Sequence, residues 1–241
     1  MPEKKEASSE AFLFLLREGY FNYGVQINAA TAGSIATAGA AFLARLVKDQ
    51  VMGDSLDIPF VKWMRVHDFK HEISYQKKDM AGNLYINAHN VNPDQGQVKF
   101  KCLPGKQTPQ LSFGCMAQEK FPLAIFCFRR QTGVGYEVRA PHLVVGLKDC
   151  LIRDWHLSGN AVEEAALWYN QISWFATSQL ADTNLPNPLP PASLGVYDVV
   201  GAQGGSISKF STFVAGFAAV ITAAAAAAVI ASDAIGGYKD G

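Results

Sequence analysis

Residues 155–175, WHLSGNAVEEAALWYNQISWF, decide the fold class of this chain, because two opposite local signals meet in them. The middle part, AVEEAALW (161–168), consists largely of helix formers and by propensity alone predicts a helix. The last part, YNQISWF (169–175), holds the aromatic and β-branched residues that favour strands. Strand-like segments precede this stretch, so we predict an interstrand loop at 157–163 that runs into a strand.

The bulk composition excludes several classes of protein. The chain has 241 residues, of which 49% are hydrophobic and 17% are charged, and this is typical of a globular protein with a sizeable core. The formal net charge is zero, which argues against nucleic acid as a partner, because phosphate binding needs an excess of Lys and Arg. A neutral chain repels its own copies weakly, which favours self-association.

The N-terminal region and the cysteines indicate where the protein is made. The apolar run AFLFLL (11–16) is too short for the core of a secretory signal, so we expect synthesis in the cytoplasm without a classical signal peptide. The four cysteines, Cys102, Cys115, Cys127 and Cys150, form no C-x-x-C pair. We interpret them as reduced cysteines that fill space in the core.

The chain divides into three parts by composition. Residues 1–41 are an N-terminal extension that ends in a run of small residues. Residues 42–179 are dense in β-branched and aromatic residues, interrupted by turn signals. Residues 180–241 hold a Pro-rich linker, a glycine cluster and an Ala-rich hydrophobic extension. Both extensions are predicted to be helical where they are rich in Ala.

The middle part reads as mainly β. His67, Phe69 and His71 alternate with polar residues, and so do Val98, Phe100 and Cys102 with lysines, as expected for strands with one wetter face. The run 122–130, PLAIFCFRR, is apolar on both faces, which is typical of a covered strand. Three successive segments, YEVRA (136–140), HLVVGL (142–147) and DCLIRDWHL (149–157), predict one bent strand or two separate ones. A short helix is expected near 108, with Thr108 as its N-cap and Pro109 in its first turn. Many short strands with one embedded helix predict a β-barrel of two packed sheets.

A catalytic centre does not emerge from the motifs. His67 and His71 are four residues apart, but on a strand this spacing does not bring them to one metal. GKQT (105–108) lacks the residues with which a phosphate loop binds nucleotide. We therefore expect no enzyme activity, cofactor or metal, although scattered carboxylates leave an acid pair as an open alternative.

The uncharged run 210–232 has three interpretations. It is an Ala-rich helix packed against protein, a membrane-active segment, or a flexible segment. It is long enough to cross a bilayer, but its many Ala residues give it a modest tendency to insert. The side chains that would pack or insert are Phe210, Phe213, Phe217, Val220, Ile221, Val229 and Ile230.

Residues 42–178 resemble the haemolysin-coregulated protein family, the inner-tube proteins of bacterial type VI secretion systems. The resemblance lies in an ordered set of segments, and none of them is specific alone. The set comprises a G-[DE]-S element at 53–55, an "[HW]xIS" end at 71–74, a "K-x-[ST]-P-x-L" pattern at 106–111, an "SxSG"-like loop at 156–159, and a closing "E-x-x-x-L-x-Y-x-x-I-x-W" pattern at 163–174. The family's "R-P-x-E" before the last strand is replaced by NAVEE, and both terminal extensions depart from a plain member.

The resemblance implies a barrel subunit that closes into a homohexameric ring, with rings stacked into a secreted tube. Its implied partners are further copies, a contractile sheath, a spike, and small effectors in the lumen. Ring closure is expected from head-to-tail, edge-to-edge packing of subunits. Stacking contacts between rings are expected from loops 76–83 and 157–163, and the candidate interface residues there are Lys77, Asp79, Ser158, Gly159, Asn160 and Glu163. Alternatives are a phage or other contractile-injection tail-tube protein, a tube-protein fusion with a membrane-active C-terminal effector in contact with a membrane through 210–232, and a monomeric ligand-binding barrel.

The resemblance also decides how the opening stretch folds. The side chains of Leu167 and Tyr169 would face one side of the last strand. In a regular strand, successive side chains point to opposite sides, so the even-numbered Ile172 and Trp174 would face the other side. We therefore expect a register shift or bulge near Gln171.

Overall fold

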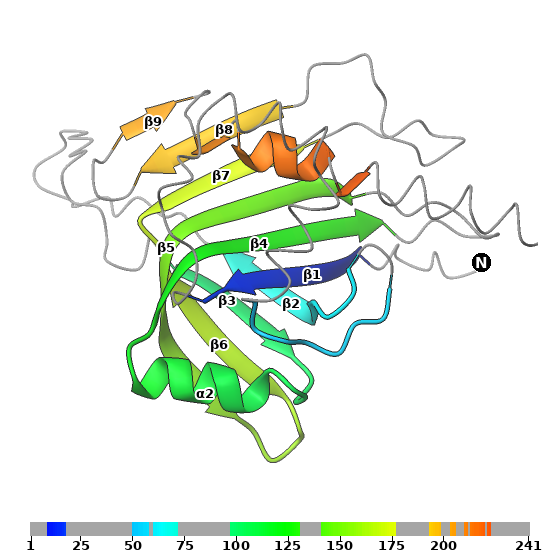
Figure 1. The fold of residues 1–241 in the computed structure, drawn as a ribbon, viewed down its shortest axis with the longest axis vertical. Helices are drawn as coiled ribbons and strands as arrows, with labels where there is room; N and C mark the ends of the chain where they lie inside the picture. Colours follow the sequence, from blue (N-terminus) through cyan, green and yellow to red (C-terminus); the bar gives the residue numbers. More distant parts are fainter. Residues whose placement is uncertain are drawn as a thin grey trace, which may run out of the picture.

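The computed structural model describes residues 9–17, 50–57, 60–71, 97–130, 141–176, 193–198, 203–205, 210–211, 213–219 and 221–222. These residues form a mainly β structure with a short helix at one end (Figure 1). The elements are β1 (Ser9–Leu16), β2 (Met64–His71), β3 (Gln97–Cys102), α2 (Thr108–Met116), β4 (Lys120–Arg130), β5 (Pro141–Leu157), β6 (Glu163–Trp168), β7 (Gln171–Ala176), β8 (Ser193–Asp198) and β9 (Gln203–Gly205). Residues 210–211, 213–219 and 221–222 are helical as well, and we call them the C-terminal helical segment.

Six of the strands close into a barrel. They are hydrogen-bonded in the order β4-β1-β2-β3-β6-β5, and β4 pairs with β5 to complete the circle. Every pairing among them is antiparallel. The predicted mainly β barrel with a short helix is therefore confirmed. Closure leaves these six strands without a free edge along most of their length.

The stretch that looked helical by propensity is the second arm of a long hairpin. Residues 163–168 form β6, so the strand prediction for AALW (165–168) is confirmed, and the strand begins already at Glu163, the last residue of the predicted loop. The hairpin breaks at 169–170, where β6 ends and β7 begins. Leu167 and Tyr169 lie inside the barrel core before the break, and Ile172 lies there after it, so the expected change of parity occurs.

The partner strand, β5, is irregular at the same level but continues through it. Lys148 pairs with Gln171 and Leu151 with Trp168, so Asp149 lies opposite the break with a left-handed backbone at φ 54°. The strands on the two sides of the break, β6 and β7, have different neighbours opposite β5. On that side β6 pairs with β3 and closes the barrel, whereas β7 pairs with β8, which pairs with β9. Residues 141–157 thus form one bent strand, in agreement with one of the two predicted alternatives, and the YEVRA part of that prediction (136–140) lies outside the described residues.

Strand pairing crosses both sequence-based domain boundaries. The apolar run 11–16, assigned to an N-terminal extension, lies in β1, which pairs with β4 over its whole length and also with β2. Beyond residue 179, β8 and β9 extend the sheet. A run of six apolar residues suits a strand that is covered on both faces. Residues 42–49 and 83–89, which belong to the part of the chain predicted to be mainly β, lie outside the described residues.

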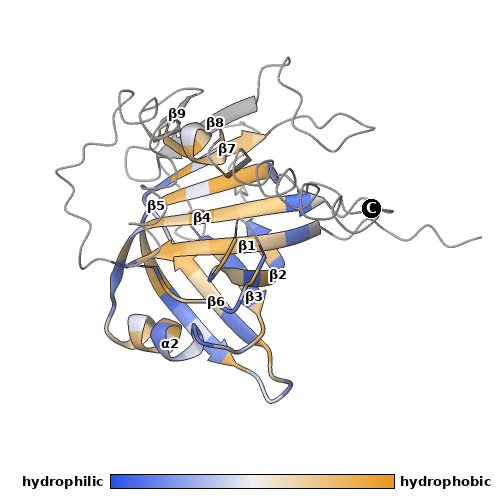
Figure 2. Cartoon of the chain, turned by 45° about the vertical axis from the view of Figure 1, so that its right-hand side comes forward, coloured by the Kyte–Doolittle hydropathy of each residue, from blue (hydrophilic) through white to orange (hydrophobic). Residues whose placement is uncertain are grey.

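Both faces of β4 are buried, as its sequence predicted. Phe121, Ala124 and Phe126 belong to the barrel core, whereas Leu123 and Ile125 belong to a second cluster outside the barrel. Figure 2 shows the consequence: β1 and β4 are orange along most of their length, while β3 and β6 carry blue segments. The barrel thus has one apolar flank and one polar flank.

Two local predictions were wrong. His67 does not share a face with Phe69 and His71, because a register shift between Val66 and Asp68 places it in a bulge, where it is exposed. Thr108 is not the N-cap of α2. The cap is Gln107, and the Thr108 hydroxyl instead accepts a hydrogen bond from the Gly105 backbone N–H at 2.9 Å. Pro109 does lie in the first turn.

Candidate functional site

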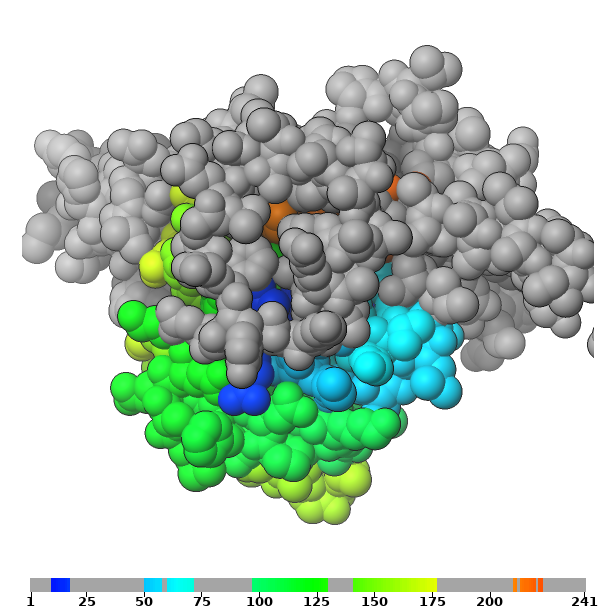
Figure 3. Space-filling view, in the orientation of Figure 1, coloured from blue at the N-terminus to red at the C-terminus, as the bar shows by residue number. Residues whose placement is uncertain are grey.

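The loop between β5 and β6 projects from the same end of the barrel as α2 (Figures 1 and 3). The Ser158 backbone N–H donates to the Val162 carbonyl at 2.9 Å, and the Ala161 N–H donates to the Ser158 carbonyl at 3.1 Å. Gly159 and Asn160 form the exposed tip, and no atom lies within 4 Å of a Cβ placed on Gly159. Backbone hydrogen bonds thus fix the base of the loop, while its tip is free of neighbouring atoms, which suits a contact with another molecule.

Glu163, at the base of this loop, is fully buried and collects hydrogen bonds from three elements. Its Oε1 accepts from the Trp155 indole N–H at 2.6 Å. Its Oε2 accepts from Thr108 Oγ1 at 3.0 Å, Gln107 Nε2 at 3.2 Å and Cys102 Sγ at 3.5 Å. A buried carboxylate needs such donors to offset lost hydration. Glu163 therefore connects the start of α2 to β3 and β5. The prediction that Glu163 lies at the surface is wrong, because its side chain is buried.

Apolar side chains are exposed around this end of the barrel, which we call the α2 end. Phe113 and Met116 on α2 are 55% and 75% exposed. Leu103, just before α2, and Leu157, where β5 enters the loop, are 60% and 43% exposed. Single exposed apolar residues are ordinary, but a group at one end of a barrel is typical of a protein-contact surface.

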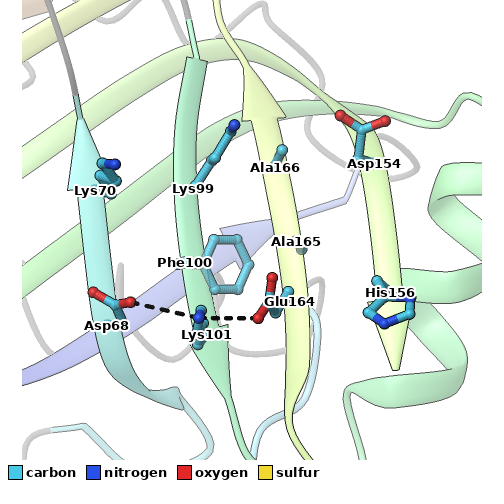
Figure 4. Close-up of a pocket in the computed structure, with 10 residues that line it drawn as sticks. All are labelled: Asp68, Lys70, Lys99, Phe100, Lys101, Asp154, His156, Glu164, Ala165 and Ala166. Carbon is cyan, nitrogen blue, oxygen red and sulfur yellow. Dashed lines mark ion pairs between the residues drawn. The ribbon is translucent and has the colours of Figure 1, made fainter. Parts of the chain in front are cut away.

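The polar flank of the barrel holds a shallow, charged hollow of about 440 Å³ (Figure 4). It lies over β2, β3, β6 and the end of β5, with Ala165 and Ala166 among its lining. At one side Lys101 Nζ lies 3.0 Å from Glu164 Oε1 and 3.9 Å from Asp68 Oδ2. The bond to Glu164 raises the pKa of Lys101 above its ordinary value. Paired charges on an exposed sheet suit a polar contact surface better than a reaction centre.

The cysteines are not poised for chemistry. All four are free, and three are buried. Burial raises the pKa of the Cys102 thiol to about 12 and raises those of Cys127 and Cys150 further. A nucleophilic cysteine needs the opposite shift. Among the residues that the structure describes, no three His, Cys, Asp or Glu side chains come together as metal ligands.

The C-terminal helical segment packs against the apolar flank. Of the side chains predicted to pack or insert, Phe210, Phe213, Phe217 and Ile221 are at most 5% exposed and join the cluster outside the barrel. Val214 and Ala218 lie in the same cluster. In the described part of the chain, no helix is long and apolar enough to cross a membrane. The burial of these four side chains agrees with the interpretation of this segment as a helix packed on protein.

Other predicted residues cannot be placed. Lys77, Asp79, Val220, Val229 and Ile230 lie outside the described residues, so the loop at 76–83 remains a prediction. Of the loop residues, Ser158 is partly exposed, while Gly159 and Asn160 are exposed. The exposed apolar group at the α2 end was missed by sequence analysis. One signal could have revealed it: TPQLSFGCM has no clear apolar stripe. Phe113 and Met116 are therefore not on the helix face of the buried Leu111.

These features define a class: a closed β-barrel protein whose candidate sites are surfaces rather than a catalytic pocket. The family model described as "Type VI secretion system effector, Hcp" matches residues 45–175, which is more than half of the chain. The chain therefore belongs to the Hcp family of type VI secretion system proteins.

Three solved structures illustrate what the chain resembles in fold. A structure described as a type six secretion system protein matches with a TM-score of 0.55 and 12% identity, covering 81% of this chain and 99% of its own. Hcp1 from Salmonella typhimurium matches at 12% identity and a TM-score of 0.48, covering 83% and 100%. Secreted Hcp3 from Pseudomonas aeruginosa matches at 12% and 0.47, covering 79% and 97%. No curated protein matches the chain. At these identities the first of the three structures supports the fold alone.

Proposed function

We propose that this chain is a structural subunit of a type VI secretion-like inner tube, in which hexameric rings stack and a contractile sheath propels the tube outward. Membership of the Hcp family over residues 45–175 carries this proposal. The role is mechanical and not enzymatic. Its partners would be further copies of the chain, sheath and spike proteins, and effectors in the lumen. The subunit would be made in the bacterial cytoplasm and leave it through the secretion system.

The α2 end is the surface that fits ring-to-ring contact. It combines the exposed loop tip at Gly159 and Asn160 with the exposed apolar side chains of Phe113 and Met116. Glu163 contributes by holding α2 and the hairpin in one arrangement, because its carboxylate binds donors on both. A rigid contact surface loses less conformational entropy on association than a mobile one.

Ring closure requires a different contact from stacking. A head-to-tail contact between unlike surfaces closes into a ring when its rotation divides a full turn evenly. The polar flank, with its paired charges around Lys101, is one surface that fits such a contact. Charge pairs contribute more to the register of an interface than to its affinity.

The fusion alternative, in which 210–232 is a membrane-active effector, is less well supported. Four of its predicted inserting side chains are buried against the barrel, and insertion would strip them from it. A phage-type tail-tube protein remains compatible with the fold and would share the ring and the stack.

Native mass spectrometry of the full chain tests ring formation, and negative-stain microscopy tests stacking. A sixfold mass supports the proposal, and a monomer at all concentrations contradicts it. Gly159→Arg places a long charge at the open loop tip and is expected to abolish tubes while leaving hexamers. Gly159→Ser is the matched control, because the space around this position accepts a small side chain. Tubes that persist in Gly159→Arg would remove the loop from the stacking contact.

A further inference from the structure

The apolar flank of the barrel is a continuous surface that spans strands far apart in the sequence. It is built from the outward side chains of β1, β4 and β5 together with the turn before β2. Its members are Phe12, Phe14, Leu16, Phe60, Trp63, Leu123, Ile125, Cys127 and Val144. All of them are at most 4% exposed. We call this surface the covered flank.

The C-terminal helical segment is what shields part of the covered flank. Its apolar residues fall at 210, 213, 214, 217, 218 and 221, which is the spacing of one helix face. The Phe217 ring lies 6.1 Å from the rings of both Phe14 and Trp63, measured between centroids. One face of the C-terminal helical segment therefore packs against the barrel.

One close approach determines how the segment sits. Gly146 on β5 lies directly beneath Val214, so a Cβ at Gly146 would come within 2.4 Å of Val214 Cγ2. The three atoms nearest to that Cβ all belong to Val214 and Phe210, and none belongs to the barrel. Glycine at this position thus serves the docking of the segment.

We propose that the covered flank is a surface for association with a second copy of this chain, and that residues 210–221 compete with that copy for it. The inference rests on the proposed function, in which copies of the chain assemble. The family match covers β4 and β5 but ends at residue 175, before the segment begins. A chain that ended there would lack Phe217, which packs against Phe14 and Trp63, and contiguous exposed apolar surface favours association.

A second copy fits this surface better than other occupants. The chain has no net charge, so copies approach without repulsion. Aromatic side chains such as Phe14 and Trp63 are those enriched at the centres of protein interfaces. The segment is tethered to the barrel, and its high effective concentration keeps the flank closed until many contacts with another copy replace it.

The test uses full-length variants that change docking without touching the barrel core. Gly146→Val is designed to lift the segment, since the three atoms nearest to a Cβ at this position belong to Val214 and Phe210. The pair Gly146→Ala with Val214→Ala removes the atoms that clash and is expected to restore docking. Ala219→Val is the matched control, because Ala219 is on the exposed side of the segment.

Chymotrypsin cleavage at Phe213 and Phe217 reports docking, and native mass spectrometry reports association. In Gly146→Val we expect cleavage at least tenfold faster than in the unaltered chain, with unchanged cleavage at Phe126 in the barrel core. We also expect a shift toward discrete multiples of the subunit mass. The compensated pair and Ala219→Val are expected to behave like the unaltered chain.

Several results would overturn the inference. These are cleavage that does not accelerate in Gly146→Val, faster cleavage without a change of mass, polydisperse aggregates in place of discrete multiples, and new binding to phosphatidylcholine vesicles without self-association. A hexamer of the unaltered chain with Phe213 and Phe217 still protected would also overturn it, while leaving the proposed tube function intact. A monomeric unaltered chain with a discretely oligomeric Gly146→Val would support the inference and contradict the constitutive hexamer.

Discussion

The Trp155 indole N–H donates a hydrogen bond of 2.6 Å to the Glu163 carboxylate, across the loop that joins β5 to β6. The same carboxylate accepts from Thr108 at the first residue of α2. One buried side chain therefore holds together the hairpin, the helix and the end of β3. The loop tip and the exposed side of α2 keep their relative position because of it.

Replacement of Glu163 by Gln is expected to destabilise the fold. Glu163 presents two acceptor oxygens to four donors, whereas Gln would turn an NH₂ group toward some of those donors. We expect a loss of about 1–3 kcal/mol in the free energy of unfolding, measured by urea denaturation. Glu164→Gln is the control, since the Glu164 side chain is 46% exposed and should cost less than about 1 kcal/mol. Equal effects of the two changes would contradict the assignment.

Arg129 is expected to be the most important ion-pair residue at the apolar flank. Its side chain is 7% exposed and pairs with Glu10 at 2.6 Å and Asp57 at 2.8 Å. Its guanidinium also lies 4.6 Å from the centre of the Phe12 ring. Arg129→Met should lower the free energy of unfolding by about 2 kcal/mol or more, because two carboxylates lose their partner and a cation–π contact is lost.

Arg65→Met is the matched control for Arg129. Arg65 pairs with the same Asp57 at 2.7 Å, but its side chain is 54% exposed, so its loss should cost less than about 1 kcal/mol. The Arg65 contribution should also fall in high salt, whereas that of Arg129 should change little. Thermal melts at low and high ionic strength would show the difference, and an equal salt response would argue against burial of Arg129.

Thiol labelling should distinguish one cysteine from the other three. Cys115 is partly exposed, whereas the remaining three are buried and have a raised pKa. In the native protein at pH 8 we expect one thiol to react with a disulfide reagent and three to react only after denaturation. Rapid labelling of Cys127 in the folded chain would contradict the barrel packing of β4.

The same thiols predict a decline of stability in alkali. The ordinary thiol pKa is 9.0, and in the folded chain that of Cys102 is raised to about 12. Between these values the unfolded chain binds fewer protons than the folded one, so the free energy of unfolding falls as pH rises from about 9 toward 12. Cys102→Ser should flatten this dependence in urea titrations at several pH values, and an unchanged slope would remove Cys102 as its source.

Gly53→Ala should be among the most damaging single changes. A Cβ at this position would come within 2.3 Å of the Trp63 carbonyl oxygen, and the neighbouring atoms are all backbone, which cannot rotate away. We expect a reduced yield of folded protein and a Tm lowered by several degrees. Gly159→Ala, in open space, is the control and should leave the Tm unchanged within about a degree.

Parts of the fold followed from residues whose local pattern agrees with their packing. Val98, Phe100 and Cys102 alternate with lysines and are buried in β3 as predicted. The run PLAIFCFRR predicted a strand covered on both faces, and the two clusters on β4 confirm it. Parity alone predicted an irregularity in the last strand, and the break at 169–170 confirms that too.

Other parts escaped prediction because the pattern that encodes them is not local. The bulge at His67 depends on the register of β2 against β3, which no single strand specifies. The run AFLFLL is equally compatible with an N-terminal extension and with a barrel strand, and its pairing partners β2 and β4 are distant in sequence. Gly146 and Val214 meet across 68 positions of sequence, so neither residue indicates the other.

By itself, the sequence determined a mainly β barrel, the places of α2 and of the strands from β3 to β7, and the family to which the chain belongs, since alternation and turn residues act within a few positions along the chain. Only the tertiary structure decided which surfaces are available. It buried Glu163 beneath the loop that had been expected to expose it, and it packed Phe210, Phe213 and Phe217 into the cluster outside the barrel. Burial depends on what covers a side chain, and the covering residues come from strands and helices remote in sequence.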